Sequence, residues 1–189
     1  IMRDLSQHIM DIIQNSIAAK ASKITANIFT SQNDEELMIE ISDNGTGMDV
    51  KTLEAVIDPF TTSRKTRKVG LGIPLFKTSA ERSGGTFKIT SSKGKGTTVL
   101  GTFNISHIDR PPLGAIGETM SALIAAYPDI EFELIFESSR GEFLLNSLSI
   151  VEKLEGVPIN NIEVLEWIKE YIDEGKSKVF GGVLNEIIG

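Results

Sequence analysis

The sequence has no cysteine among its 189 residues. A chain without cysteine has no disulfide framework, no thiolate metal site and no cysteine nucleophile. It also has no apolar run near the roughly 20 residues that a helix needs to cross a bilayer. The first residues lack the basic stretch and apolar core of a secretory signal. We therefore expect a cytoplasmic protein that does not associate with membranes.

Aromatic residues are scarce, at 6%, and there are only 6 prolines. The remaining composition is that of an ordinary globular protein, because hydrophobic residues make up 40% and charged residues 24%. This composition excludes disordered and collagen-like classes. The length fits one domain, or one domain with a small appendage.

The formal net charge of -7 is divided unevenly along the chain. Residues 1–107 carry 13 basic and 11 acidic side chains, whereas residues 108–189 carry 6 and 15. This asymmetry indicates two regions with different roles. Because an acidic protein repels a phosphate backbone, we expect no nucleic-acid partner.

The apolar pattern predicts an α+β fold for the first part of the chain. A helix, two strands, a short helix, a long loop, a helix and two strands follow one another. This order is typical of helices layered on one face of a mostly antiparallel, mixed sheet. The predicted elements are helix 4–21, strands 24–28 and 37–42, helices 49–57 and 70–82, and strands 86–90 and 97–103.

Pro111 and Pro112 predict a boundary, because proline is incompatible with a helix interior and lacks a backbone donor. We divide the chain into a domain of residues 1–106 and a small acidic α/β extension of residues 107–189 that packs on it. The extension is expected to contain helix 113–126, strand 131–137, an apolar run at 143–145 and helices 148–154 and 162–172. Trp167 and Tyr171 lie at helical spacing, as in a docking face or a core; we favour the core.

The first predicted helix carries a polar stripe on an otherwise apolar surface. Asp4, His8, Asp11 and Asn15 fall within roughly 60° of one another around the helix axis. Such a stripe either faces solvent or meets partners, because buried polar groups need hydrogen bonds. For His8 we favour a role at the rim of a pocket over a catalytic one.

Three glycine-containing motifs follow this helix. Asp43 opens the sequence DNGTGM directly after a strand, where the glycines let the backbone approach a planar ligand. In residues 61–74, hydroxyl and basic side chains precede a Gly-Leu-Gly segment at a predicted helix start. Backbone donors, a helix N-terminus and cations together are typical of an anion-binding site. Residues 94–98, GKGTT, form a hairpin turn. Taken singly, each motif is also typical of a simple turn or an exposed loop.

In this order, the polar helix, DNGTGM, the GLGIP segment and GKGTT together resemble the GHKL superfamily over about residues 3–105. Its Bergerat fold is shared by sensor histidine kinases, gyrase, the MutL repair ATPases, the ninety-kilodalton heat-shock chaperones and anti-sigma kinases. The resemblance implies a Bergerat-type sandwich with a histidine kinase-like ATP-binding domain. We expect a stand-alone, Mg-ATP-binding protein with an acidic extension.

The resemblance also implies roles for individual residues. Asn15 matches the asparagine that holds Mg²⁺ at the phosphates, a role that suits an oxygen ligand. Asp43 matches the carboxylate that reads the adenine amine, and Gly45 and Gly47, followed by Met48, shape the pocket. The remaining nucleotide contacts are the phosphate cation Lys68, the phosphate segment Gly70, Leu71 and Gly72, and the hydroxyl of Thr97 near the adenine edge, with residues 61–68 as the lid.

Asp11 lies where hydrolytic members of the superfamily carry a glutamate that activates water. Aspartate can act as a general base, but its carboxylate sits one C–C bond, about 1.5 Å, closer to the backbone. We expect phosphoryl transfer, either slow ATP hydrolysis or protein phosphorylation in the manner of anti-sigma kinases. The alternatives are a non-catalytic, ATP-gated switch that regulates a protein partner and, third, a relic that binds no nucleotide.

Overall fold

The structure is a computed structural model that describes residues 4–57 and 71–184. The strands in chain order are β1 (Lys23–Thr30), β2 (Glu36–Asp43), β3 (Phe87–Ser92), β4 (Gly96–Asn104), β5 (Glu131–Ser138) and β6 (Gly141–Asn146). The helices are α1 (Leu5–Ala18), α2 (Val50–Ile57), α3 (Gly72–Arg82), α4 (Ile116–Ala126), α5 (Ser147–Lys153) and α6 (Ile162–Phe180).

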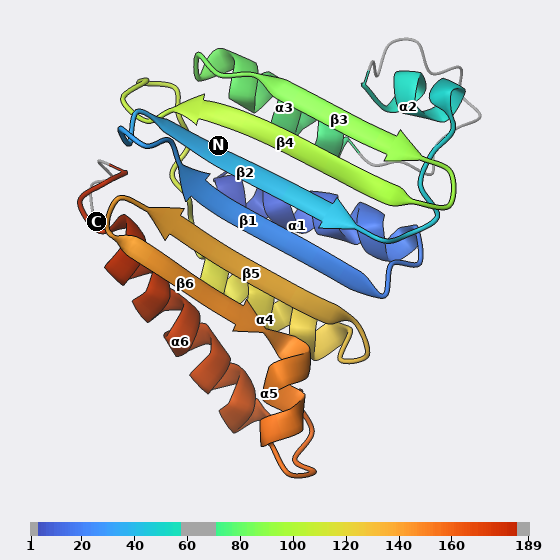
Figure 1. Cartoon of the computed structure of the whole chain (residues 1–189), viewed down its shortest axis with the longest axis vertical. Coiled ribbons are helices and arrows are strands. Elements are labelled where there is room, and N and C mark those ends of the chain that lie inside the picture. The colour runs from blue at the N-terminus through green and yellow to red at the C-terminus, as the bar shows by residue number, and fades with distance from the viewer. Residues whose placement is uncertain (1–3, 58–70, 185–189) are drawn as a thin grey trace.

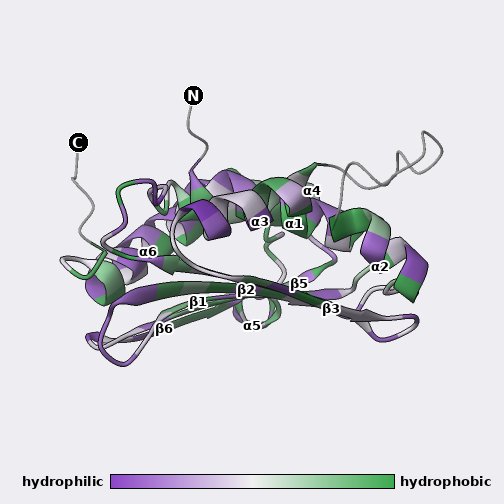
Figure 2. Ribbon diagram, turned by 90° about the horizontal axis from the view of Figure 1, so that it is seen from above, coloured by the Kyte–Doolittle hydropathy of each residue, from purple (hydrophilic) through white to green (hydrophobic). Residues whose placement is uncertain are grey.

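The strands form a single six-stranded sheet in the order β3-β4-β2-β1-β5-β6 (Figure 1). All neighbouring strands are antiparallel except β1 and β5, which run parallel. Helices α1, α3, α4 and α6 lie on the same side of the sheet (Figure 2). This mixed, mostly antiparallel sheet with a helical layer confirms the predicted α+β fold class.

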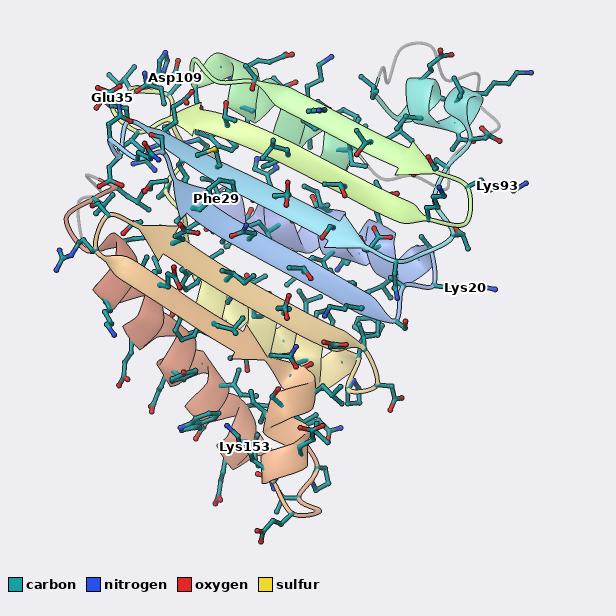
Figure 3. All side chains as sticks on the ribbon, in the orientation of Figure 1. Lys20, Phe29, Glu35, Lys93, Asp109 and Lys153 are labelled. Atoms are coloured by element: carbon teal, nitrogen blue, oxygen red, sulfur yellow. The ribbon has the colours of Figure 1, made fainter. Side chains whose placement is uncertain are left out.

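The core lies between the sheet and the helical layer. Alternate side chains of each central strand point into it, as Ile24, Ala26 and Ile28 do on β1. The other side chains of β1 face the opposite side of the sheet, where Phe29 is half-buried (Figure 3). From α1, the buried residues include those expected from helical spacing, such as Leu5 and Ile9. Ser6 and His8 are buried as well, although His8 was expected on the polar stripe.

Helix α1 has a defined beginning and an end that falls earlier than predicted. Asp4 is its N-cap and accepts a hydrogen bond from the backbone N–H of Gln7 at 3.0 Å. The helix ends at Ala18 rather than at residue 21. Lys20 adopts a φ of 60°, which an α-helix does not accommodate.

Helix α4 begins at Ile116 rather than at residue 113. Gly114 adopts a φ of 80°, outside helical conformation. The carbonyls of Pro112 and Leu113 accept hydrogen bonds from the N–H groups of Leu5 and Ser6, both at 2.9 Å. The segment before α4 therefore satisfies the free donors at the start of α1.

Residues after the proline pair continue the same sheet and the same helical layer. Strand β5 pairs with β1 from Lys23↔Glu131 to Phe29↔Glu137, and β6 follows as the last strand. The Lys23 ammonium lies 3.0 Å from a Glu131 carboxylate oxygen across this junction. Helix α6 extends to Phe180, eight residues beyond the predicted end.

The expectation that Trp167 and Tyr171 are core residues was wrong. Trp167 is 50% exposed and Tyr171 39% exposed. The core face of α6 is instead formed by residues such as Ile168 and Ile172, which are fully buried. Helical spacing predicted two aromatic residues on one side of α6, but not which side faces the sheet.

Among the described residues, no helix combines the length and the apolar composition needed to cross a membrane.

Candidate functional site

A cavity of about 400 Å³ lies between α1, the loop after β2 and strand β4. Its walls come from segments far apart in the sequence, including the starts of α2 and α3 as well as these three. The lining residues are Ile12, Asn15, Ser16, Ala18, Ala19, Ile41, Asp43, Thr46, Gly47, Met48, Thr52, Ile73, Thr97 and Val99. The predicted site residues Asn15, Asp43, Gly47, Met48 and Thr97 are therefore brought together.

Asp43, the last residue of β2, carries the acidic group of the cavity. The Ser16 hydroxyl donates to its Oδ2 at 2.7 Å, and the Gly45 N–H donates to its Oδ1 at 2.8 Å. An ionised carboxylate has about four acceptor positions, so both oxygens can accept further hydrogen bonds. Asp43 is thus a fixed acceptor with unused capacity toward a ligand.

Apolar side chains form much of the cavity wall around Asp43. Ile12, Ile41, Ile73 and Val99 contribute branched side chains, and the remaining polar lining is made of Asn15, Ser16, Thr46, Thr52 and Thr97. A mostly apolar pocket with a few oriented polar groups is typical of sites for flat, partly polar molecules. This combination fits a purine ring with a hydrogen-bonding edge.

Gly47 of the DNGTGM motif and Gly96 of the GKGTT motif lie where two backbone segments approach too closely for a side chain. A Cβ on Gly47, whose φ is +63°, would lie 2.0 Å from the Ser92 carbonyl oxygen. A Cβ on Gly96 would lie 1.9 Å from the Asp43 carbonyl oxygen. The DNGTGM loop and the β3–β4 turn are therefore in direct contact, and side chains at these positions would separate them.

Gly45 is constrained in a similar way, since a Cβ there would lie 2.7 Å from the Ala19 carbonyl oxygen. The loop is further tied to β3 by Ser91, whose hydroxyl accepts from the Met48 N–H at 2.8 Å. The same hydroxyl lies 2.9 Å from that of Thr97. These contacts hold Met48 and Thr97 at the edge of the cavity.

Asn15 presents a buried amide nitrogen, Nδ2, that has no hydrogen-bond partner among residues 4–57 and 71–184. Buried polar groups are almost always hydrogen-bonded, so this amide is a candidate ligand contact. The same portion of the chain holds no cluster of three or more His, Cys, Asp or Glu that could cage a metal. The unpartnered Nδ2 is a donor and suits an acceptor atom of a ligand, whereas Mg²⁺ would need the Oδ1 of Asn15 together with substrate phosphates.

Asp11 lies one helical turn before Asn15 but does not line the cavity. A Cβ on Gly72 would lie 2.6 Å from the Asp11 Cβ, so α1 and α3 are in close contact here. Leu71, just before α3, is 67% exposed. Lys68, Gly70 and the lid segment 61–68 lie outside the described residues.

His8 is only 4% exposed and does not line the cavity. Its ring packs against Phe76 of α3, with centroids 5.9 Å apart. The His8 side chain is therefore buried in the contact between α1 and α3.

Asp49, which precedes α2, accepts a hydrogen bond from the Thr52 N–H at 2.8 Å. Hydrogen bonds from the Thr52 backbone and side chain hold the pKa of Asp49 below its ordinary value of 3.8. Thr52 itself lines the cavity. The start of α2 is therefore anchored at the cavity by an ionised cap.

Sequence reasoning missed Ser16 and Ser91 as site residues. Ser16 falls at helical spacing on the apolar side of α1, where a lone hydroxyl needs a polar partner. A hydroxyl on an apolar helix face could therefore have indicated that Ser16 has a polar partner in the site. Ser91 sits among several serines and threonines of a hairpin, and nothing in the sequence distinguishes it from them.

Residues 2–107 match the family described as "Histidine kinase-, DNA gyrase B-, and HSP90-like ATPase". This match covers more than half of the chain, and the chain belongs to that family. The expected membership of the GHKL superfamily is thereby confirmed.

Several curated relatives are sensor kinases. Sporulation kinase B of Bacillus subtilis (strain 168) is 35% identical over 96 residues, which cover 50% of this chain and 22% of that protein. Sensor histidine kinase ZraS of Escherichia coli (strain K12) is 29% identical over 94 residues, 50% of this chain and 20% of that protein. The chain spans about a fifth of the length of these relatives.

Among solved structures, the Aquifex aeolicus MutL ATPase domain complexed with ADP is similar to this chain, with a TM-score of 0.50 and 18% identity. The alignment covers 82% of this chain and 68% of that one. At this identity, the similarity shows a shared fold.

Proposed function

We propose that the protein binds Mg-ATP in the 400 Å³ cavity and uses it for phosphoryl transfer. The observation that carries this proposal is the convergence of Asn15, Asp43 and Thr97 on one cavity, although they come from α1, β2 and β4. Membership of the ATPase family supports ATP as the ligand. The MutL domain of similar fold was solved with ADP.

Asp43 is proposed to accept a hydrogen bond from the adenine amine, while the isoleucines and Val99 contact the faces of the ring. Its two existing donors, Ser16 and Gly45, hold the carboxylate in one orientation, so adenine meets a preorganised acceptor. Gly47 and Met48 form the wall beside it, Gly45 holds the Asp43 carboxylate, and Thr97 offers a hydroxyl at the edge.

Asn15 is proposed to provide the protein oxygen ligand for Mg²⁺, which would neutralise charge on the phosphates when bound. Leu71 and Gly72 lie at the N-terminus of α3, where free N–H groups and the helix dipole favour an anion. Lys68 and Gly70 are proposed to extend this phosphate contact.

Asp11 is proposed as the general base, one turn from Asn15 along α1. It would take the proton from a water or from a hydroxyl of a partner protein as that oxygen attacks the γ-phosphorus, the bond from this phosphorus to the β–γ bridging oxygen breaks, and ADP leaves. The test measures phosphate release and radiolabel transfer from γ-labelled ATP to candidate proteins, for wild type and Asp11→Asn. A loss of turnover with unchanged ATP affinity is expected; equal turnover in both would remove Asp11 from the mechanism.

A second candidate is an ATP-gated switch that binds nucleotide and changes its affinity for a protein partner without turnover. It is favoured by the position of Asp11 outside the residues that line the cavity. The same experiment separates the two functions. Tight ATP binding with neither phosphate release nor radiolabel transfer to protein by the wild type would support the switch. In either case we propose a protein partner rather than a nucleic acid, given the acidic charge.

A further inference from the structure

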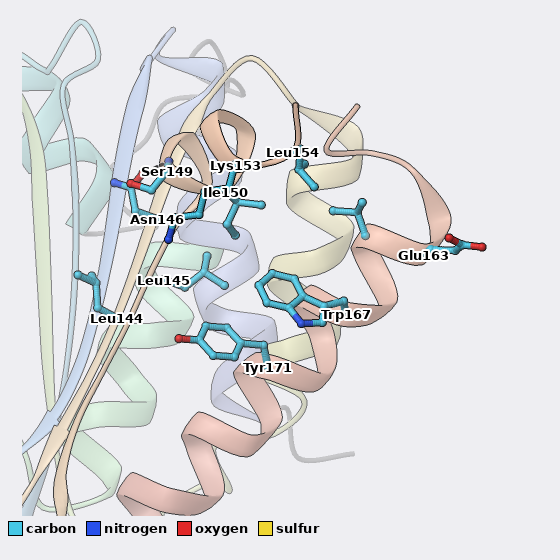
Figure 4. A pocket seen from close by; sticks show the side chains of 11 residues that line it. Leu144, Leu145, Asn146, Ser149, Ile150, Lys153, Leu154, Glu163, Trp167 and Tyr171 are labelled. Carbon is cyan, nitrogen blue, oxygen red and sulfur yellow. Dashed lines mark hydrogen bonds between the residues drawn. The ribbon is translucent and has the colours of Figure 1, made fainter. Parts of the chain in front are cut away.

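A second hollow, of about 720 Å³, lies far from the ATP cavity, between β6, α5 and α6 (Figure 4). It is lined by Leu144, Leu145, Asn146, Ser149, Ile150, Lys153, Leu154, Glu163, Val164, Trp167 and Tyr171. We call it the edge groove. No residue of the edge groove lines the ATP cavity.

The edge groove is open because α6 and β6 diverge. They touch at Gly175, where a Cβ would lie 2.2 Å from the Phe143 ring, so no side chain fits between them there. Toward the start of α6, Tyr171 and Trp167 line the gap, and their stacked rings have centroids 5.2 Å apart. The result is a wedge with an aromatic wall on the α6 side.

The groove follows the free edge of the sheet. Leu144 and Leu145 are neighbours on β6 and point to opposite faces, yet both line it. β6 is the last strand of the sheet and pairs only with β5 within the described residues. Its outward backbone donors and acceptors are thus available to an added strand.

Three large apolar or aromatic side chains of the groove are exposed. Leu144 is 57% exposed, Trp167 50% and Tyr171 39%. Contiguous exposed apolar patches of this kind on otherwise polar surfaces mark binding sites. Trp and Tyr are also the residue types that contribute most to the binding energy of interfaces.

The chain segment that forms the groove is rich in acidic residues, although the lining itself carries one acid, Glu163, and one base, Lys153. Residues 141–175 carry eight acidic and two basic side chains. Glu142 of β6 lies directly opposite Glu137 of β5, and no cation in the described part of the chain pairs with either. Like charges directly opposite each other in a sheet repel, so a cation beside Glu142 would relieve this pair.

We propose that the edge groove binds an extended, cationic segment of a partner protein. The segment adds to the free edge of β6, places alternate apolar side chains against Trp167 and Tyr171, and directs its Lys or Arg side chains toward Glu142. Alternation follows from strand geometry, because successive side chains of an added strand point to opposite faces of the sheet.

The charge of the groove argues against the other occupants. A second copy of this chain would bring the same acidic edge against its own and repel itself at low ionic strength. An anionic membrane surface would be repelled for the same reason. A cationic peptide is attracted, and its association therefore weakens as salt rises.

The test uses the full chain and three synthetic peptides of equal length: alternating Lys and Leu, alternating Lys and Ser, and alternating Glu and Leu. Trp167 is the only tryptophan, so its emission reports occupancy of the groove directly. We expect the Lys-Leu peptide to bind and shift the emission to shorter wavelength, the Lys-Ser peptide to bind more weakly, and the Glu-Leu peptide not to bind. Affinity should fall by about tenfold or more on raising NaCl from about 0.05 M to 0.5 M.

Two variants locate the binding. Glu142→Lys and Leu144→Ser both change exposed positions of β6, and each should lower the affinity for the Lys-Leu peptide by about tenfold. Their matched controls are Glu36→Lys on β2, three strands away, and Ile108→Ser, where the side chain is 93% exposed. Both controls should bind as the wild type does.

Unchanged Trp167 emission, or equal affinity in wild type, Glu142→Lys and Leu144→Ser, would overturn the proposal. So would a concentration-dependent dimer in sedimentation velocity that Leu144→Ser dissociates, since this would assign the groove to self-association. Thermal unfolding of each variant confirms that it is folded. Because the ATP cavity is remote, failure here leaves the proposed ATP binding untouched.

Discussion

Among single residues, Asp43 matters most for the proposed recognition of adenine, and its carboxylate is held in place by two neighbours. Ser16 and Gly45 donate to its two oxygens from α1 and from the loop after β2. The sequence singled out Asp43 because its motif, DNGTGM, is one of the four that together resemble the GHKL superfamily. Its support by Ser16 was not predicted, because a hydrogen bond between residues 27 positions apart is set by tertiary packing.

Ser16→Ala tests this support. The variant removes a hydrogen bond to the carboxylate, so Asp43 is less well oriented, and ATP affinity should fall about threefold to tenfold. The measurement is calorimetric titration with ATP. Ser83→Ala is the matched control, because Ser83 is also fully buried but donates to a carbonyl at the end of α3. Equal affinity in Ser16→Ala and wild type would contradict the role given to Ser16.

At the scale of elements, the site depends on contact between the DNGTGM loop and the β3–β4 hairpin. Both were predicted from turn chemistry, since paired glycines in short loops indicate unusual backbone conformations. Their mutual contact was not predicted, because turn residues reveal local conformation and not the neighbour. The same limit applies to α6, where spacing grouped Trp167 with Tyr171 but not the side that faces solvent.

Gly47→Ala tests that contact. Gly47 combines a φ of +63° with a Cβ position 2.0 Å from the Ser92 carbonyl oxygen. We expect a loss of about 2 kcal/mol or more in the free energy of unfolding, measured in urea, together with weaker ATP binding. Gly94→Ala is the control, since Gly94 has a φ of +79° but nothing within 4 Å of the Cβ position. Gly94→Ala should lower the free energy of unfolding by only about 1 kcal/mol. If Gly47→Ala lowered it by the same amount, the contact between the two loops would contribute nothing to stability.

At the scale of the whole molecule, the acidic C-terminal part and the ATPase family domain share one sheet. The strands of both parts could be predicted from alternation, but their partners could not, because pairing β1 with β5 joins residues more than 100 positions apart. The proline pair correctly marked a break in secondary structure. The division at residues 106 and 107 stays a prediction.

Truncation tests how far the first part depends on the second. A chain of residues 1–106 would lose the β5 partner of β1 and the carbonyls of Pro112 and Leu113 that cap α1. We predict that this fragment does not form a stable monomer, because it exposes a sheet edge and part of the core. Size-exclusion chromatography and circular dichroism measure this outcome. A monomeric fragment that unfolds cooperatively and binds ATP would contradict it.

Asp34 also connects the family domain to the C-terminal part. It lies just after the end of β1, whereas the Lys23–Glu131 ion pair lies at the start of that strand. The Asp34 carboxylate accepts hydrogen bonds from the side chains of Ser139, in the β5–β6 turn, and Thr30. These bonds hold the pKa of Asp34 below its ordinary value of 3.8. A carboxylate with a lowered pKa in the folded state stabilises the protein above its unfolded pKa, and this contribution is lost as pH falls through the folded pKa.

Asp34→Asn should therefore lower the midpoint of thermal unfolding above about pH 5, and the difference from wild type should shrink below pH 3.8. Asparagine tolerates the φ of 54° at this position, so the backbone is preserved. Asp129→Asn, in the exposed turn before β5, is the control. A difference that does not change with pH would contradict the ionised role of Asp34.

The central claim is that an adenine nucleotide occupies the cavity with its amine on Asp43. Calorimetric titration of ATP into wild type, Asp43→Asn and the exposed control Glu36→Gln tests it most directly. Hydrogen bonds to charged acceptors contribute roughly 1.5 to 3 kcal/mol, so Asp43→Asn should bind ATP about tenfold or more weakly, while Glu36→Gln matches the wild type. No heat of ATP binding in the wild type, or equal affinity in all three proteins, would contradict the account.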